Sequence, residues 1–310
     1  MKTLLLIALI FSFEINAKDE KKKVSHAGHK HKAGEECDVL GSGSGSADKL
    51  AKDVSKAVEQ LELSPDFCKS FNQCYGYGSE SDCSNTKSYY NGNNQCSLGK
   101  QEYAALSYYM GSGYGCINSV LFGVKKDVDV KPITTSLNQA LKKFPRYDGF
   151  VARGTALPET VFNEHKVGAV ITYNAFTSTS VRASIAEGFS QRSGKKSFFL
   201  IYSHSGRPVM GLSQGEGEVL FASGTKFKVL NHEKDSESSY FLMREVPPGE
   251  TPAAASKADQ LVMAKVKALE TNPPTAYETE YSCPRDGKME KVLKQVNAPS
   301  YGERFKYFSK

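Results

Sequence analysis

Hydrophobic and polar positions follow two different patterns along this 310-residue chain. Between residues 100 and 146, apolar residues recur every three to four positions, which is typical of amphipathic helices. This pattern predicts a helix over Gln101–Met110 and, after a Gly-Ser-Gly break, a second helix over Cys116–Phe122. A third predicted helix begins near Ile133 and ends where Pro145 removes the next backbone donor.

Beyond Tyr147 the pattern changes to short apolar or alternating runs separated by Gly, Pro, Asn and Ser, which is typical of β-strands. Two helices interrupt this part, one over Val181–Phe189 and one over Lys257–Leu269. Helices that come first and strands that follow, without strict alternation, predict an α+β fold. The predicted strands are Gly149–Arg153, Gly168–Tyr173, Ser197–Tyr202, Pro208–Leu212, Glu218–Phe221, Lys226–Leu230 and Tyr240–Arg244.

The N-terminal end has the pattern of an export signal. Residues 1–17 combine a charged start, an apolar run of about ten residues and a small-residue cleavage site, which predicts a secretory signal peptide. The chain is therefore expected to be secreted or periplasmic. The apolar run is too short to span a bilayer, and no later run is longer, so stable membrane insertion is not expected. Residues 18–46 are rich in Lys, His, Gly and Ser and predict a flexible tail and linker.

The remaining chain divides into two parts. Residues 47–246 are expected to form one domain, which opens with a helix and contains a Cys-rich loop region over residues 64–99. Residues 247–310 are expected to form a C-terminal helix and a basic tail. The net charge of +6 comes from the two ends: residues 18–36 hold six Lys against four acidic residues, and residues 284–310 hold seven Lys and Arg against three. Because the middle is neutral, no nucleic-acid groove is expected.

Seven cysteines follow the signal segment, and none forms a Cys-x-x-Cys pair, so a zinc site is not expected. In an oxidising compartment, the four cysteines within residues 68–96 are expected to form two disulfides, with all three pairings open. The odd number leaves one thiol over, for which Cys37 in the tail is the candidate. His26, His29 and His31 fit a hydrated tail better than a metal site. The cysteines are Cys37, Cys68, Cys74, Cys83, Cys96, Cys116 and Cys283.

The stretch Gln214–Phe221 contains two carboxylates at the start of a predicted buried strand. On an extended strand, Glu216 and Glu218 share one face, with their Cα atoms roughly 6.5 Å apart and Gly217 opposite. Two carboxylates placed so close repel each other unless a cationic group lies between them. A solvated strand face is the alternative for this pair taken alone.

Two further polar pieces lie in the strand-rich half. Arg153 ends the predicted strand of Phe150-Val-Ala-Arg-Gly-Thr155, and its planar fork suits phosphate groups, although a surface salt bridge is the alternative. Ser178 lies at the end of another strand, in Thr177-Ser-Thr-Ser180, where it is expected to face the same crevice as Glu218. Ser180 is interpreted as the N-cap of the following helix.

The order Arg153, then Ser178-Thr-Ser180, then Glu216-x-Glu218 resembles the arginine-type mono-ADP-ribosyltransferases, which include bacterial toxins and vertebrate ecto-enzymes. The resemblance extends to Ser107–Leu121, which looks like the family's helix before the NAD crevice, and to Gly224–Val229, which looks like its strand after the catalytic glutamate. It covers about residues 100–232. It implies a helical N-terminal part packed on a mostly antiparallel β-sandwich, with NAD as substrate and no metal.

The resemblance assigns a role to each polar residue. Glu218 matches the carboxylate that stabilises positive charge on the NAD ribose, and Ser178 matches the serine that orients it. Arg153 matches the arginine that binds the dinucleotide phosphates, and Gly154 the backbone contact to nicotinamide. Glu216 matches the residue that engages the acceptor guanidinium, so arginine of a target protein, expected to come from a host, is the implied acceptor.

Two positions outside these motifs complete the comparison. The segment Phe189–Lys196 looks like a loop that folds over NAD, in which Phe189 and Arg192 are candidate NAD contacts. Ser213 stands where several actin-modifying toxins have an aromatic residue, which argues against actin as the target. The resemblance therefore predicts an exported NAD-dependent protein-arginine ADP-ribosyltransferase, a bacterial toxin or effector. The alternatives are an NAD glycohydrolase with the same site and a non-catalytic exported binding protein.

Overall fold

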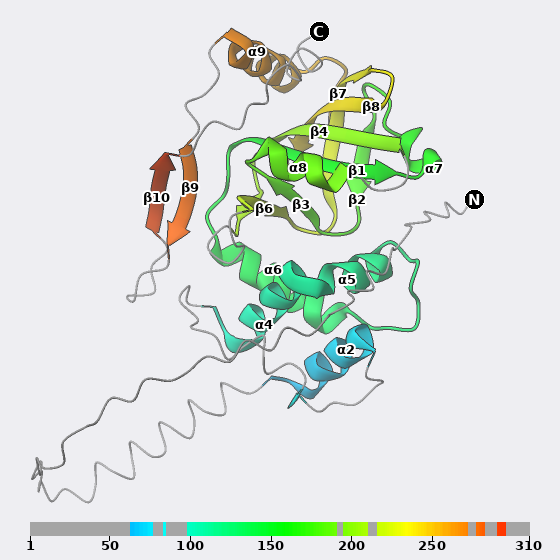
Figure 1. Ribbon diagram of the computed structural model, residues 1–310, viewed down its shortest axis with the longest axis vertical. Coiled ribbons are helices and arrows are strands. Elements are labelled where there is room, and N and C mark those ends of the chain that lie inside the picture. Colours follow the sequence, from blue (N-terminus) through cyan, green and yellow to red (C-terminus); the bar gives the residue numbers. More distant parts are fainter. Residues whose placement is uncertain are drawn as a thin grey trace, which may run out of the picture. The chain divides into compact units, whose positions relative to one another are not determined.

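The described part of the chain contains helices, an eight-stranded sheet and a small hairpin (Figure 1). The computed structural model describes residues 63–76, 83–84, 98–190, 195–209, 216–271, 277–282 and 290–295. All of these belong to one compact unit. The predicted signal peptide, the flexible tail, the helix before residue 63, Arg192 and Ser213 lie outside the described residues.

The first described helix, α2 (Pro65–Tyr75), lies where the sequence predicted a loop, so that prediction is wrong. Its start is specified locally, because the Ser64 hydroxyl accepts a hydrogen bond from the Phe67 amide at 3.3 Å and Pro65 occupies the first turn. Its end is specified by Gly76, which adopts the left-handed conformation with φ of 90°. Cysteines and polar residues masked these capping signals in the sequence.

The next helices form an almost continuous run. The predicted break at the Gly-Ser-Gly sequence is wrong, because the chain passes through it as a π-helix, η2 (Tyr109–Gly113). Such wide turns are rare and occur frequently at functional sites. The helix near Ile133 is confirmed, and Lys142 and Lys143 in its last turn complement the helix dipole. The helices around η2 are α4 (Lys100–Tyr108), α5 (Tyr114–Leu121) and α6 (Lys131–Lys143).

Six of the seven strands predicted from the sequence are confirmed, whereas of the predicted strand Pro208–Leu212 only Pro208 lies in a described strand and residues 210–212 lie outside the described residues. The strand order in the sheet is β2-β7-β8-β4-β1-β3-β6-β5, and all neighbours are antiparallel except β4 and β8. The strands are β1 (Gly149–Leu157), β2 (Val170–Tyr173), β3 (Thr177–Ser180), β4 (Lys195–Ser203), β5 (Arg207–Pro208), β6 (Glu218–Phe221), β7 (Thr225–Lys234) and β8 (Ser238–Val246). A short helix, α7 (Glu159–Phe162), and α8 (Ala183–Ser190) connect strands, and α9 (Lys257–Thr271) follows β8.

The sheet folds back over its own core. Phe221 of β6 and Phe227 of β7 are in edge-to-face contact with ring centroids 5.0 Å apart, although β3, β1, β4 and β8 separate these strands in the sheet. Both rings belong to one apolar cluster with Phe199, Phe241 and Met243. The sheet therefore encloses a sandwich-like core, because its two ends share one set of buried side chains.

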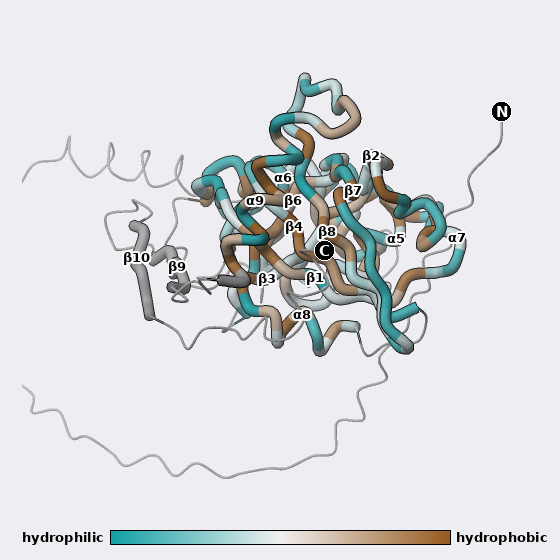
Figure 2. The backbone as a smooth tube through the Cα atoms, turned by 90° about the horizontal axis from the view of Figure 1, so that it is seen from above, coloured by the Kyte–Doolittle hydropathy of each residue, from teal (hydrophilic) through white to brown (hydrophobic). Residues whose placement is uncertain are grey.

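The opposite side of the central strands carries a second apolar cluster. Leu200 of β4 and Leu242 of β8 pack there with Val262 and Val266 of α9. Consequently β4 and β8 are buried on both faces, and Figure 2 shows hydrophobic stretches along these central strands. Such two-sided burial produces near-continuous apolar runs rather than alternation.

A third cluster holds the helices together. Its members include Phe71, Leu106 and Leu137 from three helices, together with Phe176 and Leu220 from the sheet region. Two disulfides add covalent links, Cys68–Cys83 and Cys74–Cys116. The prediction that both disulfides lie within residues 68–96 is wrong for the second bridge, since Cys116 lies on α5. Cys37, Cys96 and Cys283 lie outside the described residues.

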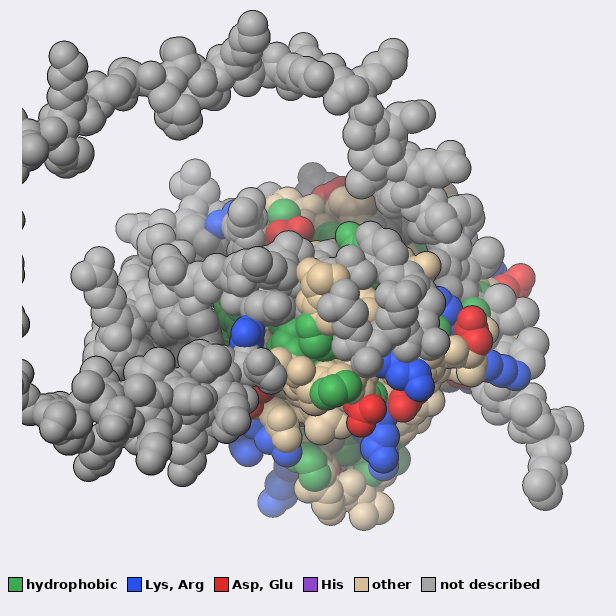
Figure 3. Space-filling model, turned by 90° about the horizontal axis from the view of Figure 1, so that it is seen from below, with side chains coloured by type: hydrophobic (Ala, Val, Ile, Leu, Met, Phe, Trp, Pro, Cys, Tyr) green, Lys and Arg blue, Asp and Glu red, His purple; other side chains and the backbone are tan. Residues whose placement is uncertain are grey.

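Near the C-terminal end, strands β9 (Tyr277–Ser282) and β10 (Glu290–Gln295) pair as an antiparallel hairpin, where the sequence predicted only a basic tail. In the described part of the chain, no helix is long and apolar enough to cross a membrane. Where the face in Figure 3 is described, basic and acidic side chains lie beside one another rather than in a single positive surface.

Candidate active site

A cavity of about 340 Å³ lies between the η2–α5 helical run and strands β1, β3 and β6. This size is within the range of small-molecule sites. The sequence-predicted residues Arg153, Gly154, Ser178, Phe189, Glu216 and Glu218 all line it. The other lining residues are Tyr109, Met110, Gly111, Tyr114, Asn118, Ala152, Thr155, Phe176, Thr179, Ser180, Ile185 and Ala186.

Glu218 is the first residue of β6, and only 6% of it is exposed. The neighbouring strand β3 places Ser178 so that its hydroxyl donates a 2.6 Å hydrogen bond to Glu218 Oε1. The pKa of the Glu218 carboxyl is raised to about 7: burial raises it most and the nearby carboxylate of Glu216 also raises it, whereas the Ser178 hydrogen bond and Arg153 lower it. A carboxylate desolvated in this way has much to gain from a cationic ligand.

Glu216 is not in the strand, so the predicted geometry of the pair is wrong. It lies in a bend, β6 begins two residues later, and Gly217 between them has φ of 58°. This left-handed glycine turns the chain, which leaves Glu216 exposed while Glu218 is buried. The two carboxylates therefore experience different environments at one cavity, which is typical of groups with different roles.

Ser180 fixes the position of this bend. Its hydroxyl donates a 2.5 Å hydrogen bond to the carbonyl of Glu216 and accepts one of 2.9 Å from the amide of Arg182. The interpretation of Ser180 as a helix N-cap is wrong, because Ser180 is the last residue of β3 and helix α8 begins at Ala183. The side chain instead ties the loop of Glu216 to the sheet.

Arg153 lies in the middle of β1 rather than at its end. Its Nη1 donates a 2.7 Å hydrogen bond to the carbonyl of Ser178, which ties the arginine to the strand that holds Glu218. Its Nε is buried and has no hydrogen-bond partner among the described residues. A buried donor without a partner is costly, and phosphate oxygens would satisfy it.

Gly154, the next residue, allows a close contact between backbones. A Cβ atom at this position would lie 1.6 Å from the carbonyl oxygen of Ala186 on α8. Only glycine therefore permits α8 to pack this closely on β1. The same helix carries Phe189, which lines the cavity and is 41% exposed.

Two cavity residues received no individual role from the sequence, although both belong to the stretch that resembled the family's helix. The Tyr109 hydroxyl donates to the carbonyl of Phe176 at 3.3 Å, and Asn118 Nδ2 donates to the same carbonyl at 3.3 Å and to the Tyr109 hydroxyl at 3.1 Å. Burial raises the pKa of Tyr109, so the phenol stays protonated. Asn118 Oδ1 is buried and without a partner among the described residues, which makes it a candidate acceptor for a ligand.

The arrangement combines one buried carboxylate, one exposed carboxylate and an arginine with an unused donor. Within the described residues, no group of three or more His, Cys, Asp or Glu side chains is placed to hold a metal ion. The chemistry offered is charge stabilisation beside a phosphate-containing ligand.

Residues 121–246 match the profile of the family described as NAD:arginine ADP-ribosyltransferase (ART), and this range contains Arg153, Ser178 and both glutamates. This stretch, which is less than half of the chain, is therefore similar to that family. The ART match begins after Tyr109 and Asn118, so the helical wall of the cavity precedes it.

Two relatives and one solved structure are similar to part of this chain. Mav from Mycobacterium avium (strain 104) is 38% identical over 143 residues, which are 46% of this chain and 17% of Mav. The NAD(+)--protein-arginine ADP-ribosyltransferase Tre1 from Serratia proteamaculans (strain 568) is 27% identical over 147 residues, which are 46% of this chain and 31% of Tre1. The solved structure of Vis toxin, an ADP-ribosyltransferase from Vibrio splendidus, is 27% identical, with 53% of this chain and 82% of that chain covered at a TM-score of 0.44. The chain thus spans less than a third of Mav and of Tre1.

Proposed function

We propose that this protein transfers ADP-ribose from NAD to an arginine of a target protein. The observation that carries the proposal is the hydrogen-bonded pair of Ser178 and buried Glu218 in one cavity with Arg153, whose Nε has no partner among the described residues. The ART family match and the name of Tre1 support NAD as the donor and protein arginine as the acceptor.

In the proposed reaction, the bond between the ribose C1′ and the nicotinamide nitrogen breaks, and its electron pair leaves with nicotinamide. Positive charge then develops on the ribose, and the Glu218 carboxylate stabilises it from a site with little water. Ser178 holds that carboxylate in place through its 2.6 Å hydrogen bond. Arg153 binds the dinucleotide phosphates through its unused Nε, and Asn118 Oδ1 accepts from the bound ligand.

Glu216 directs the second half of the reaction. Its exposed carboxylate at the cavity mouth pairs with the acceptor guanidinium, whose nitrogen attacks C1′ as its proton passes to the carboxylate. Water as acceptor needs no such partner, so the same cavity without this contact would catalyse NAD hydrolysis. Glu216 is therefore the residue that favours transfer over hydrolysis.

We further propose that the protein is exported and acts as a bacterial effector or toxin on a host protein. The export pattern of residues 1–17 and the two disulfides support this placement. Immunoblotting of the culture medium, the periplasm and the cytosol of an expressing bacterium tests it. Protein that stays in the cytosol with its N-terminus uncleaved would contradict export.

Two variants test the reaction. Glu218→Gln is expected to reduce both transfer to agmatine, a simple guanidino compound, and NAD hydrolysis by roughly a hundredfold or more, because it removes the charge-stabilising group. Glu216→Gln is expected to lose transfer while hydrolysis largely remains. Both activities are measured with labelled NAD.

Circular dichroism of each variant serves as the control for folding. Near-normal NAD cleavage by Glu218→Gln would contradict the assignment of Glu218. An equal loss of both activities in Glu216→Gln would mean that Glu216 supports the NAD site rather than the acceptor. Hydrolysis as the sole activity of the unmodified protein, across guanidino acceptors and lysates, would favour an NAD glycohydrolase.

A further inference from the structure

One wall of the cavity is built from a single helical run outside the sheet. Tyr109, Met110, Gly111, Tyr114 and Asn118 all line the cavity and all lie on η2 and α5. The catalytic candidates Arg153, Ser178 and Glu218 lie on the opposite, stranded wall. The width of the cavity therefore depends on how firmly η2 and α5 are held.

The helical run of η2 and α5 has little intrinsic stability. Helix α5 has eight residues, among them Gly115, and it follows a π-helical turn that contains Gly111 and Gly113. Short helices with glycine have little stability of their own and depend on tertiary contacts. Toward the sheet, Tyr109 and Asn118 both donate hydrogen bonds to the Phe176 carbonyl, at 3.3 Å each.

Helix α2 supports the run from behind at two points. The first is a ring contact, in which Phe71 lies 4.4 Å from the Tyr108 ring, and that ring in turn lies against Gly113. The second is the disulfide between Cys74 of α2 and Cys116 of α5. Phe71 and Cys74 are three residues apart and share one face of α2.

The position of Cys116 makes this disulfide a support for the cavity wall. Tyr114 and Asn118 lie two residues before and after it, and each helical residue turns the direction by roughly 100°. Cys116 therefore projects about 160–200° away from both cavity residues, toward α2. The bridge holds α5 from the side opposite the cavity.

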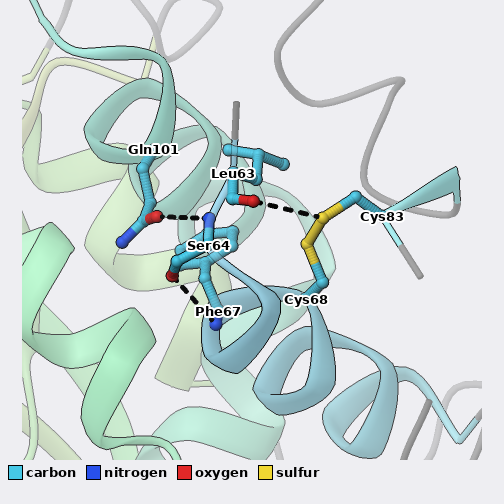
Figure 4. Close-up of a disulfide and its surroundings, with 6 residues drawn as sticks. All are labelled: Leu63, Ser64, Phe67, Cys68, Cys83 and Gln101. Atoms are coloured by element: carbon cyan, nitrogen blue, oxygen red, sulfur yellow. Dashed lines mark hydrogen bonds between the residues drawn. A yellow bond between two sulfur atoms is a disulfide. The ribbon is translucent and has the colours of Figure 1, made fainter. Parts of the chain in front are cut away.

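The other disulfide, Cys68–Cys83, provides a matched comparison. Figure 4 shows Cys68 of α2 bonded to Cys83, whose sulfur lies 3.7 Å from the carbonyl of Leu63. Neither cysteine belongs to a cavity-lining element, and Cys68 is fully buried. Cys74 and Cys116 are both half-buried, as is Cys83, and thus within reach of a small thiol reagent.

We propose that the Cys74–Cys116 disulfide is a redox-sensitive support of the NAD cavity. In the oxidised protein it holds Tyr114 and Asn118 in position, and its reduction loosens that wall and weakens NAD binding. Reduction by a dithiol transfers two electrons and two protons to the bridge, which gives two thiols while the dithiol closes to a cyclic disulfide. This inference rests on the proposed function, and it confines full activity to an oxidising compartment.

The test compares two double variants of the whole oxidised protein. Cys74→Ser/Cys116→Ser is expected to raise KM for NAD roughly tenfold, with kcat within about twofold, because small misplacements of a binding wall reduce productive binding. Cys68→Ser/Cys83→Ser is expected to keep both constants within about twofold, because its bridge touches no cavity element. Hydrogen exchange of the amides of residues 109–118 is measured beside the kinetics and should accelerate in the first variant alone.

The exchange measurement separates this inference from the proposed function. If the wild-type protein neither binds NAD nor transfers ADP-ribose, the proposed function is contradicted. Amide exchange of residues 109–118 would then still show whether the Cys74–Cys116 disulfide supports the cavity wall. Unchanged exchange in Cys74→Ser/Cys116→Ser, or equal acceleration in both variants, would overturn the inference. So would a KM equal to that of wild type.

If Cys74→Ser/Cys116→Ser does not fold, the Cys68→Ser/Cys83→Ser protein is reduced with dithiothreitol and then reoxidised. Peptide mapping after alkylation reports the state of the Cys74–Cys116 bridge at each stage. A rise in KM and exchange that reverses on reoxidation supports the inference, whereas constant values through the cycle contradict it.

Discussion

At the scale of single residues, Glu218 couples activity to stability. Its pKa is raised to about 7, above all by burial, so the carboxyl is largely protonated in the free protein below that pH. Charge stabilisation on NAD requires the ionised form. We therefore expect kcat/KM to rise with pH through an inflection near 7, which a pH profile of NAD cleavage checks, since kcat/KM reports the free enzyme. A flat profile between pH 5.5 and 8.5 would contradict this role.

The same group makes a prediction about stability. Because the folded-state pKa of about 7 exceeds the ordinary carboxyl pKa of 4.5, the folded protein binds the proton more tightly than the unfolded chain does. Its favourable contribution is complete below pH 4.5 and is lost as pH rises through 7. The isosteric change Glu218→Gln removes the dependence, so the variant should gain up to about 3 kcal/mol relative to wild type between pH 4.5 and pH 8. Urea unfolding at several pH values measures this, and parallel curves would exclude it.

Arg153 illustrates geometry that a point charge cannot replace. One nitrogen is used by the Ser178 carbonyl at 2.7 Å, and Nε remains buried without a partner in the described part of the chain. Arg153→Lys keeps the charge but loses the fork, so we expect NAD affinity to fall roughly tenfold or more by calorimetry. Arg207→Lys is the control, because that arginine also donates to a backbone carbonyl, that of Phe144, but does not line the cavity. Equal affinities of Arg153→Lys and wild type would argue against a phosphate contact.

At the scale of elements, the close packing of helix α8 on β1 requires that Gly154 has no side chain. Gly154→Ala would place a methyl group 1.6 Å from the Ala186 carbonyl, so α8 must move away from β1. We expect a loss of about 2 kcal/mol or more of stability together with NAD binding, measured by thermal unfolding and calorimetry. Gly188→Ala on the same helix is the matched control, since a Cβ there meets nothing within 4 Å. That change should stabilise the helix by up to about 1 kcal/mol. Normal NAD binding by Gly154→Ala would contradict the dependence.

Elements whose pattern reflects burial could be predicted from the sequence, and elements defined by long-range contacts could not. The amphipathic period of α6 and the apolar runs of β4 and β8 were sufficient signals. Helix α2 was missed because its capping residues stand among cysteines and polar residues. The glycines of the π-helical turn predict a break, whereas in the structure a Cβ at Gly113 would lie 2.5 Å from the Tyr108 ring, a close contact that the local pattern does not encode.

At the scale of the site, the residue types were accessible from sequence but their arrangement was not. Arg153, Ser178 and Glu218 were found through their order along the chain, and the fold brings all three to one cavity. The separation of Glu216 from the strand depends on one backbone angle at Gly217. The Cys74–Cys116 bridge joins positions 42 residues apart, and such pairings follow from the fold alone.

At the scale of the whole molecule, a buried ionic network attaches α9 to the sheet. Asp259 of α9 accepts from Lys228 Nζ of β7 at 2.5 Å and from Arg244 Nε of β8 at 2.5 Å. All three residues are at most 6% exposed, and Arg244 also binds Glu250. Burial alone would raise the pKa of Asp259, but the hydrogen bonds from Lys228, Arg244 and Ser256 outweigh it and lower that pKa to about 2. The network therefore stabilises the fold above pH 3.8, and that stability is lost as pH falls through about 2.

Removing one partner of such a network leaves buried charge without compensation. We expect Asp259→Asn to destabilise the protein by roughly 3–5 kcal/mol in urea unfolding at pH 7, and to release α9 from the apolar cluster of Leu200 and Leu242. Hydrogen exchange along Lys257–Leu269 should then accelerate, because α9 depends on this attachment. Glu159→Gln is the control, since it breaks the exposed Lys195–Glu159 pair and should cost less than about 1 kcal/mol. If Asp259→Asn and Glu159→Gln changed the free energy of unfolding equally, apolar contacts alone would hold α9 on the sheet, and the buried charges would not contribute to its attachment.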